Sequence, residues 1–383
     1  MIWIYIAIFL IILFFLFGYI REIYTPKFTP SKEIIKKVDE ILKNPINVAI
    51  DLLKKEVKIA RISDKYYIYL HLAFLYMEIG KFEKALRLSR SLIVGAYIDE
   101  SIRNRAIILV GEIYLKLNRI KEGLEFLLEH KINDKNYYFL IAKFYEQLKD
   151  YKNSAYYYKK IIHNLEKEQF SNILSKLSIS AIRNGELEIG KKLISEASKV
   201  YENGFLILAR GAYQFYNGNL NIAIELFKDG LIKSPNLYSY IKDELKEAYF
   251  EVGNYNEFLD FLRNLENPIA KLDYIRILYN MGEFEKARDY FYENKEIFLS
   301  NISLLSKAYE IIKDEQIIKE ILNISKNLNF YKCNSCNKEF NNFYIECPNC
   351  YRVGTLNVIY KKTSKSLEDI KSQIIEEYIE WEK

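Results

Sequence analysis

The stretch that decides the fold is residues 72–85, which read Leu72-Ala73-Phe74-Leu75-Tyr76-Met77-Glu78-Ile79-Gly80-Lys81-Phe82-Glu83-Lys84-Ala85. Apolar and small side chains recur on both sides of Gly80 at the three- and four-residue spacing of a helix. Gly80 allows a tight turn, because a glycine adopts backbone conformations that a Cβ opposes. The stretch therefore predicts two helices joined by a turn and packed closely through small residues such as Ala73 and Ala85.

The same pattern returns along the chain at a regular period. Its copies centre on the turn residues Gly80, Asn118, Lys149, Gly185, Gly218, Gly253 and Gly282. The mean separation of these turns is about 34 residues, the length of a tetratricopeptide repeat. Residues 31–327 read as helix after helix with short breaks between them. The sequence predicts a tetratricopeptide-repeat solenoid, a class of protein whose concave surface binds other proteins.

Aromatic residues are abundant, with 33 Tyr and 23 Phe, and most of them are expected to fill the core of the helical array. Some fall at positions where an inner helix would face the concave surface. On register alone, the candidate partner-binding residues are Tyr67, Phe74, Phe205 and Phe215.

The N-terminus predicts a membrane anchor. Residues 2–20 contain no charged side chain, and a helix of this length reaches about 28 Å, enough to span a bilayer core. A buried core helix or a cleavable signal peptide fits less well, because no basic residue precedes the run and no small-x-small cleavage site follows it. Positive charge follows the run at Arg21, Lys27, Lys32, Lys36 and Lys37. The positive-inside bias therefore places the body of the protein on the cytoplasmic side of the membrane.

Composition excludes several functional classes. The chain has 383 residues, of which 50% are hydrophobic and only 6 are Pro, so extended disorder is excluded. The net charge of +5 is too weak for a dedicated nucleic-acid-binding protein. The three histidines, His71, His130 and His163, have no paired ligand or catalytic partner in the sequence. No catalytic residue is predicted, and the protein is interpreted as a non-enzyme.

All four cysteines lie within one short segment and predict a metal site. Two Cys-x-x-Cys pairs, Cys333 with Cys336 and Cys347 with Cys350, are separated by ten residues. Four thiolates with this spacing complete a tetrahedral site for one ion, Zn²⁺ or Fe, and the sequence does not decide between them. Because about 30 residues cannot bury a sufficient core, metal binding is expected to supply most of the folding free energy of this module.

The predicted domain organisation follows from these features. The anchor takes residues 1–20, the repeat array 21–327, the four-cysteine module 328–360 and a C-terminal helix 361–383. The last of these carries an apolar stripe at Ile370, Ile374 and Tyr378. We expect this helix to pack on its own chain, with docking to another protein as the alternative.

The order of anchor, repeats and cysteine module resembles the lipopolysaccharide assembly protein B (YciM) family, whose C-terminal module is rubredoxin-like. The motif Tyr331-x-Cys333-x-x-Cys336, followed by Tyr344-Ile345-Glu346-Cys347-Pro348-x-Cys350, is similar to the closing motif of that family. Residues 44–51, 71–85 and 219–235 resemble its repeats. Asn337 stands where the family usually has Gly, and Asn also tolerates left-handed backbone geometry. The predicted fold class is all-α, with a transmembrane helix, a tetratricopeptide-repeat solenoid and a small rubredoxin-like or zinc-ribbon module.

The resemblance implies an inner-membrane adaptor that regulates lipopolysaccharide (lipid A) biosynthesis. Its implied partners are the membrane AAA+ protease FtsH and the lipid A deacetylase. The sequence features above are also compatible with two other functions: a generic membrane-tethered scaffold for an envelope complex, and a rubredoxin-like electron carrier. A nucleic-acid-binding module is disfavoured, because Lys332, Lys338 and Arg352 are nearly balanced by Glu339 and Glu346. The sequence leaves the oligomeric state open, homo-oligomers included.

Overall fold

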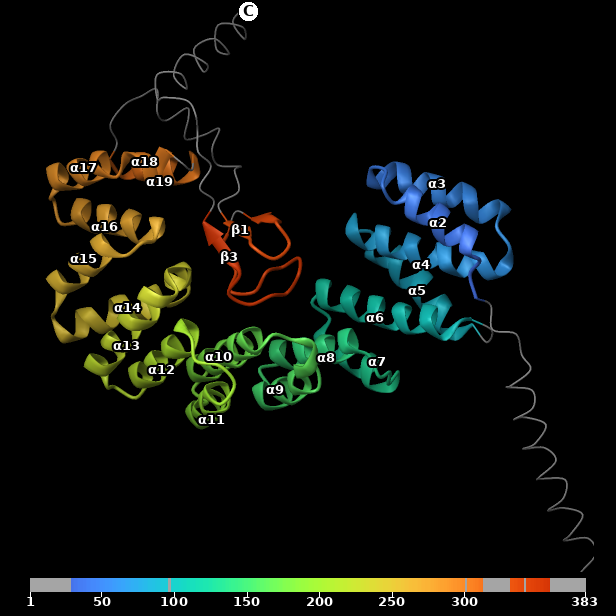
Figure 1. Ribbon diagram of the computed structural model, residues 1–383, viewed down its shortest axis with the longest axis horizontal. Coiled ribbons are helices and arrows are strands. Elements are labelled where there is room, and N and C mark those ends of the chain that lie inside the picture. The colour runs from blue at the N-terminus through green and yellow to red at the C-terminus, as the bar shows by residue number, and fades with distance from the viewer. Residues whose placement is uncertain (1–28, 96–97, 300–301, 313–330, 341, 359–383) are drawn as a thin grey trace, which may run out of the picture. The chain divides into compact units, whose positions relative to one another are not determined.

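The computed structural model of the protein describes residues 29–95, 98–299, 302–312, 331–340 and 342–358 (Figure 1). The predicted anchor at residues 1–20 and the predicted helix at residues 361–383 lie outside these ranges. Among the helices that are described, none has both the length and the apolar character needed to cross a bilayer. The described residues form two compact units that divide between Ile161 and Ile162. The repeat spacing did not predict this division, and each unit is described by itself.

The first unit is built from helices that follow one another as antiparallel pairs. They are α2 (Lys32–Ile41), α3 (Ile46–Ile59), α4 (Ile62–Glu78), α5 (Phe82–Val94), α6 (Glu100–Lys116), α7 (Ile120–Glu129), α8 (Lys135–Gln147) and α9 (Tyr151–Lys159). Each pair also packs against the next, since α4 contacts both its partner α5 and the following helix α6. This is the packing of a helical repeat array.

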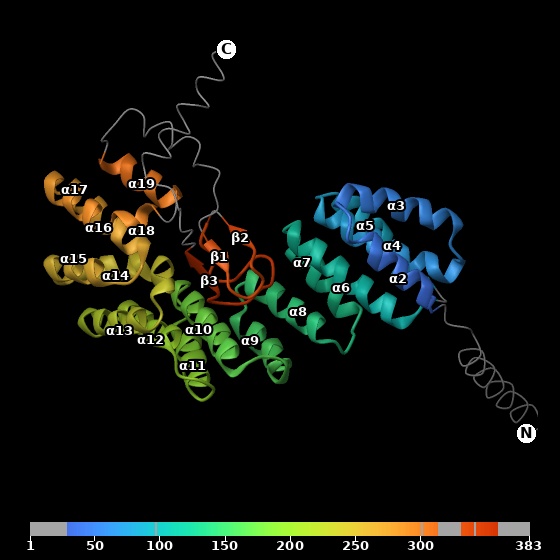
Figure 2. The same cartoon turned by 45° about the horizontal axis from the view of Figure 1, so that its top comes forward.

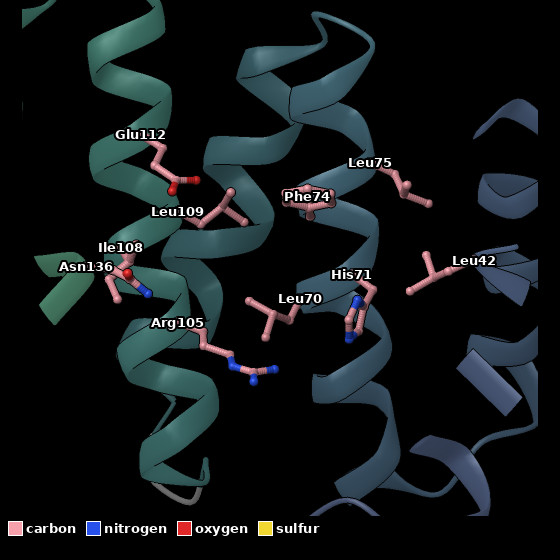
Figure 3. Close-up of a pocket in the computed structure, with 10 residues that line it drawn as sticks. All are labelled: Leu42, Leu70, His71, Phe74, Leu75, Arg105, Ile108, Leu109, Glu112 and Asn136. Atoms are coloured by element: carbon pink, nitrogen blue, oxygen red, sulfur yellow. The ribbon is translucent and has the colours of Figure 1, made fainter. Parts of the chain in front are cut away.

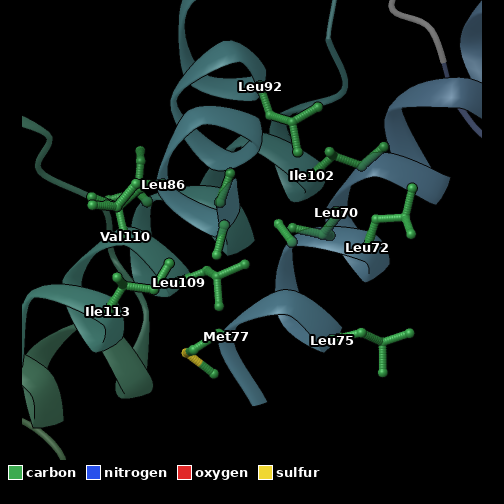
Figure 4. Close-up of a cluster of buried hydrophobic side chains, with 14 of the residues drawn as sticks. Leu70, Leu72, Leu75, Met77, Leu86, Leu92, Ile102, Leu109, Val110 and Ile113 are labelled. Carbon is green, nitrogen blue, oxygen red and sulfur yellow. The ribbon is translucent and has the colours of Figure 1, made fainter. Parts of the chain in front are cut away.

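The core of the first unit forms where successive pairs meet. Figure 4 shows aliphatic side chains of α4, α5 and α6 packed together, among them Leu72, Leu86 and Val110. The small residues of the repeat pattern lie inside this core, where Ala73 and Ala85 are fully buried. Removing aliphatic surface of this kind from water is the main favourable contribution to folding.

The turns between paired helices have the geometry that the sequence pattern predicts. The seven turn residues all have positive φ, from 57° at Asn118 to 84° at Gly185. Each follows a helix whose last turn is closed in the same way; for example, the amide of Lys81 donates to the carbonyl of Tyr76. This six-residue closure satisfies carbonyl groups that a helix end leaves unpaired. Glycine is common at these positions because it enters the left-handed region without steric cost.

The second unit is also built from paired helices. It contains η1 (Ile162–Asn164), α10 (Lys167–Arg183), α11 (Leu187–Ser198), α12 (Gly204–Tyr216), α13 (Leu220–Lys233), η2 (Pro235–Leu237), α14 (Tyr238–Val252), α15 (Tyr255–Asn264), α16 (Pro268–Asn280), α17 (Phe284–Glu293), α18 (Lys295–Leu299) and α19 (Ile302–Ile312). Helices α12 and α13 pack closely at Gly211, where a Cβ would lie 2.6 Å from the Phe227 ring.

A small antiparallel sheet ends the described chain. Strands β1 (Tyr331–Cys333), β2 (Glu339–Phe340) and β3 (Leu356–Val358) form a sheet in the order β2-β1-β3. In its register, Tyr331 pairs with Phe340 on one side and with Val358 on the other. We call residues 331–358 the ribbon. The predicted fold class is confirmed for the described residues: helical repeats of the tetratricopeptide type with a small C-terminal cysteine module.

Candidate metal centre and binding groove

The ribbon presents its cysteines on two turns with the same hydrogen-bonding pattern. In the first turn the amide of Cys333 donates to the carbonyl of Lys338, and the amide of Asn337 donates to the carbonyl of Cys333. In the second turn the amide of Cys347 donates to Arg352, and that of Tyr351 to Cys347. The residue after each pair has a left-handed backbone, with φ of 59° at Asn337 and 58° at Tyr351. Asn337 thus adopts the geometry expected of the residue that replaces Gly.

These turns bring all four sulfurs together. The sulfur atoms of Cys333, Cys336, Cys347 and Cys350 lie within 4.8 Å of one another. The Sγ atoms of Cys333 and Cys350 are 3.6 Å apart, as are those of Cys336 and Cys347. Four sulfurs at about 2.3 Å from a tetrahedral ion would be separated by about 3.8 Å, so the spacing fits one Zn²⁺ or Fe ion. Cys333 and Cys347 are fully buried, and all four cysteines are free of disulfides.

The surroundings of the thiols prepare them for a cation. Burial opposes ionisation of Cys333, but hydrogen bonds from the Thr355 hydroxyl and from backbone amides at residues 335 and 336 lower its pKa to about 6. Burial and the three neighbouring thiols raise the pKa of Cys350. The four thiolates are therefore not all stable without a compensating charge. A bound divalent cation supplies that charge, since metal ligation deprotonates a thiol outright.

The ribbon is attached to the helices of the second unit by polar contacts. Lys176 of α10 forms an ion pair with Glu346, with 2.7 Å between Nζ and Oε2. The side-chain amide of Asn236 in η2 donates to the carbonyl of Gly354 at 3.2 Å. Burial raises the pKa of the Tyr331 hydroxyl, and a hydrogen bond with Ser239 of α14 offsets part of that rise. Figure 2 shows the ribbon strands beside these helices.

Gly354 of the ribbon lies against helical residues of the second unit. Its φ of 68° lies in the left-handed region. A Cβ at this position would lie 3.7 Å from Asn172 and 4.0 Å from both Leu237 and Phe205. The ribbon therefore packs directly on helices of the second unit, to which it belongs.

A separate feature, in the first unit, is an open groove between α4 and α6. Its volume is about 480 Å³ (Figure 3). Most of its lining is aliphatic or aromatic, and the complete lining is Leu42, Leu70, His71, Phe74, Leu75, Arg105, Ile108, Leu109, Glu112 and Asn136. We call this feature the α4–α6 groove. An apolar cleft with a few polar groups is the usual form of a ligand-binding site.

Three ionisable side chains lie in the α4–α6 groove. Burial, together with the nearby Arg105, lowers the pKa of His71, and its Nε2 is a buried atom without a hydrogen-bond partner among the described residues. Burial also raises the pKa of Glu112. Within the described part of the chain, neither Arg105 nor Glu112 forms an ion pair. These polar groups are thus available to a ligand that enters the groove.

The four candidate partner-binding residues fall in different environments. Phe74 is 45% exposed and lines the α4–α6 groove. Tyr67 is buried on the same helix, one turn before His71, and the centroids of the two rings are 4.6 Å apart. Phe215 is half-buried and packs edge-on against Tyr216. Phe205 is 2% exposed and lies against the ribbon, so its surface is taken by the chain itself.

Sequence reasoning missed several residues of these sites. It assigned no role to His71 and did not single out Arg105 or Glu112, which lie on inner helices whose other groove residues are mostly apolar. It also missed the contact between Lys176 and Glu346, which joins residues far apart in the chain. In the sequence, these residues could have been recognised as charged side chains at inward-facing helical positions. Helical periodicity alone does not reveal which residue such a side chain contacts.

No protein-family model matches the chain, and no curated protein matches it in sequence. Solved structures of helical repeat proteins resemble it at low sequence identity. A tetratricopeptide repeat protein from Parabacteroides merdae is 14% identical, with 68% of this chain and 99% of that chain covered and a TM-score of 0.41. A thermophilic tetratricopeptide repeat protein from Thermus thermophilus is also 14% identical, with 48% of this chain and 99% of that one covered and a TM-score of 0.30.

A third similar structure is the Cut9–Hcn1 hetero-tetramer of the APC/C. It is 13% identical to this chain, the alignment covers 76% of this chain and 55% of that one, and the TM-score is 0.34. The structural class stated here rests on the chain's own helix pairs and turns. The fold and the cysteine geometry define a tetratricopeptide-like helical array with a ribbon able to bind one metal ion.

Proposed function

We propose that this protein is a non-enzymatic adaptor, anchored in the inner membrane with its body on the cytoplasmic side, that binds other proteins. The observation that carries the proposal is the α4–α6 groove. It is open and mostly apolar, and it lies on helices of a repeat array, a class that uses such surfaces for protein contacts. The described residues supply a binding surface, and no constellation of catalytic groups was predicted from the sequence.

The lining of the α4–α6 groove favours an extended or helical segment of a protein with an apolar side chain. Phe74 offers an exposed aromatic face, and Leu70 and Leu109 form the adjacent wall. Arg105 and Glu112 lie on the same helix, α6, and can orient a bound segment through opposite charges. Aromatic and Arg side chains of this kind often supply most of the binding energy in protein interfaces.

The proposed client is the lipid A deacetylase, presented to the FtsH protease. This finer proposal rests on the resemblance to the lipopolysaccharide assembly protein B family, through the anchor, the repeats and the motifs around Cys333–Cys336 and Cys347–Cys350. A membrane anchor supports such a role, because confining adaptor, protease and client to one surface raises their effective concentration. The metal in the ribbon has a structural role in this proposal, since all four ligands come from the protein.

The test is the half-life of the deacetylase after protein synthesis is blocked, in a host that has both the deacetylase and FtsH. Deleting residues 1–20, or replacing Cys347 by Ser, should leave the deacetylase stable and abundant. The matched control is His163→Ala, an exposed position outside the groove and the ribbon, which should leave turnover normal. An unchanged half-life of the deacetylase when this protein is deleted completely would exclude the deacetylase as its client. The generic membrane-tethered scaffold would then be the better reading, and partners that co-purify from membranes would define it.

A further inference from the structure

The turn between α3 and α4 exposes two large aliphatic side chains. Ile59, the last residue of α3, is 75% exposed, and Ile62, the first residue of α4, is 62% exposed. Val94, at the end of α5, is 84% exposed. Because α5 runs antiparallel to α4, its end returns to the same edge of the unit. Single exposed aliphatic residues are ordinary, but a cluster of them at one edge is typical of a surface that contacts a membrane or another protein.

Cations surround the two isoleucines. Lys58 and Arg61 are exposed, Lys65 is half-exposed, and none of the three forms an ion pair with another described residue. We call Lys58, Ile59, Arg61, Ile62 and Lys65 the basic edge.

The two carboxylates within residues 56–65, Glu56 and Asp64, are already engaged. Glu56 pairs with Lys37 at 2.6 Å, and only 12% of its side chain is exposed. Asp64 is 6% exposed and accepts hydrogen bonds from the amide and hydroxyl of Ser31. The accessible charge of residues 56–65 is therefore positive.

The chain enters the first unit beside the basic edge. The amide of Ser31 donates to Asp64 at 2.7 Å, which fixes the start of α2 next to the start of α4. Residues 21–30 separate this point from the predicted anchor, and a chain of that length spans at most about 35 Å when fully extended. A membrane crossed by residues 2–20 would therefore lie within reach of the basic edge.

We propose that the basic edge binds the anionic lipid surface of the membrane that the anchor crosses. Ile59 and Ile62 enter the interface between headgroups and acyl chains, while Lys58, Arg61 and Lys65 contact lipid phosphates. Aliphatic side chains flanked by Lys and Arg are the chemistry of an interfacial membrane contact. This inference rests on the anchor included in the proposed function. Its consequence is that the first unit has a fixed orientation on the membrane instead of moving freely on a tether.

The test places a tryptophan reporter at the basic edge of the full-length chain. The native tryptophans are first replaced by Trp3→Phe and Trp381→Phe, and Ile62→Trp is then introduced. The matched control is Val48→Trp, which lies near the other end of α3 and is 47% exposed in the native protein. Both variants are reconstituted in nanodiscs of phosphatidylcholine and phosphatidylglycerol, with and without brominated acyl chains, which quench tryptophan fluorescence on contact.

We expect brominated lipid to reduce the fluorescence of the Ile62→Trp variant at least twofold and to leave the Val48→Trp variant nearly unchanged. Adding Lys58→Gln and Arg61→Gln, or omitting phosphatidylglycerol, should abolish most of the quenching. Equal quenching in the two variants, or a blue shift that depends on protein concentration and not on lipid, would overturn the inference; the latter outcome would indicate a contact between two copies.

Retention on the discs separates failure of this inference from failure of the anchor. A chain that stays with the discs while the Ile62→Trp variant is not quenched overturns the membrane contact alone. A chain that does not stay with the discs overturns the anchor, and the membrane contact with it.

Discussion

Lys176 and Glu346 join helix α10 to the ribbon through an ion pair that is almost removed from solvent. The Nζ and Oε2 atoms are 2.7 Å apart, and the two side chains are only 9% and 11% exposed. Glu346 directly precedes Cys347, so the pair connects the helical array to the backbone that carries a metal ligand. An intact ion pair in such surroundings contributes little to the total stability of the protein. Replacing one partner is strongly destabilising, because the charge of the other loses its compensation in a nearly buried site.

The first prediction follows from this asymmetry. Lys176→Met should destabilise the docked ribbon by about 3 kcal/mol, because it removes the cation paired with the nearly buried carboxylate of Glu346. The double variant Lys176→Met with Glu346→Leu should recover most of the loss. Hydrogen exchange of residues 331–358 measures both effects. Equal protection in the wild type and the single variant would show that the pair does not hold the ribbon in place.

The second prediction concerns the metal. Purified protein should contain one Zn or Fe ion per chain, and Cys350→Ser should remove it and unfold the ribbon. The helices should remain folded, because each repeat is stabilised mainly by its neighbours. Metal analysis together with hydrogen exchange tests this. Exchange should rise in the ribbon and at the surface it covers, around Asn172 and Leu237, and helical circular dichroism should change little. A ribbon that stays protected without metal would contradict the prediction.

The third prediction separates binding from stability in the α4–α6 groove. Phe74→Ala should reduce co-purification of the deacetylase and FtsH several-fold while changing the free energy of unfolding by less than about 1 kcal/mol, since the side chain is 45% exposed. Leu70→Ala in the same groove should instead cost about 2–5 kcal/mol, because Leu70 is only 5% exposed. Phe250→Ala, at a phenylalanine of the second unit that is 51% exposed, is the control for partner binding. Equal losses of binding at Phe74 and Phe250 would argue against the groove.

The fourth prediction is a pH dependence at Glu112. Burial raises the pKa of this carboxyl above 4.5, so the folded protein holds the proton more tightly than the unfolded chain. The stability associated with Glu112 is complete below the unfolded pKa and is lost as the pH rises through the folded pKa. Glu112→Gln removes this loss, so its Tm relative to wild type should increase as the pH is raised from 4 to 7. A constant difference over that range would show that Glu112 titrates normally.

The helical array could be predicted from the sequence because its signal is local. All seven turn residues, predicted from the residue pattern and its spacing, have left-handed backbones, including Asn118 and Lys149, which are not glycine. Cys333, Cys336, Cys347 and Cys350 could be grouped for a similar reason, since two short turns place their sulfurs.

Contacts between segments far apart in the chain could not be predicted. Phe205 has the register of an inner-helix residue, but the ribbon, which begins more than a hundred residues later, covers it. The division of the array after Ile161 is likewise absent from the repeat pattern. The ion pair between Lys176 and Glu346 depends on how the ribbon docks, which no spacing within either segment encodes.

The last prediction uses one of the two turn residues that are not glycine. Lys149 has a φ of 63°, a conformation that costs a side-chain-bearing residue about 1–2 kcal/mol and costs glycine almost nothing. Lys149→Gly should therefore stabilise the protein, by about 0.5–1 kcal/mol after the larger unfolded-state entropy of glycine is subtracted. The reverse change, Gly218→Ala, should destabilise it by about 1 kcal/mol. A Cβ at Gly218 would meet no atom within 4 Å, so this cost comes from the backbone alone. Asn118→Gly should gain less than Lys149→Gly, because asparagine tolerates the left-handed region better than lysine does. Thermal unfolding of the three variants measures all three effects, and a destabilised Lys149→Gly variant would show that the lysine side chain contributes more than its backbone strain removes.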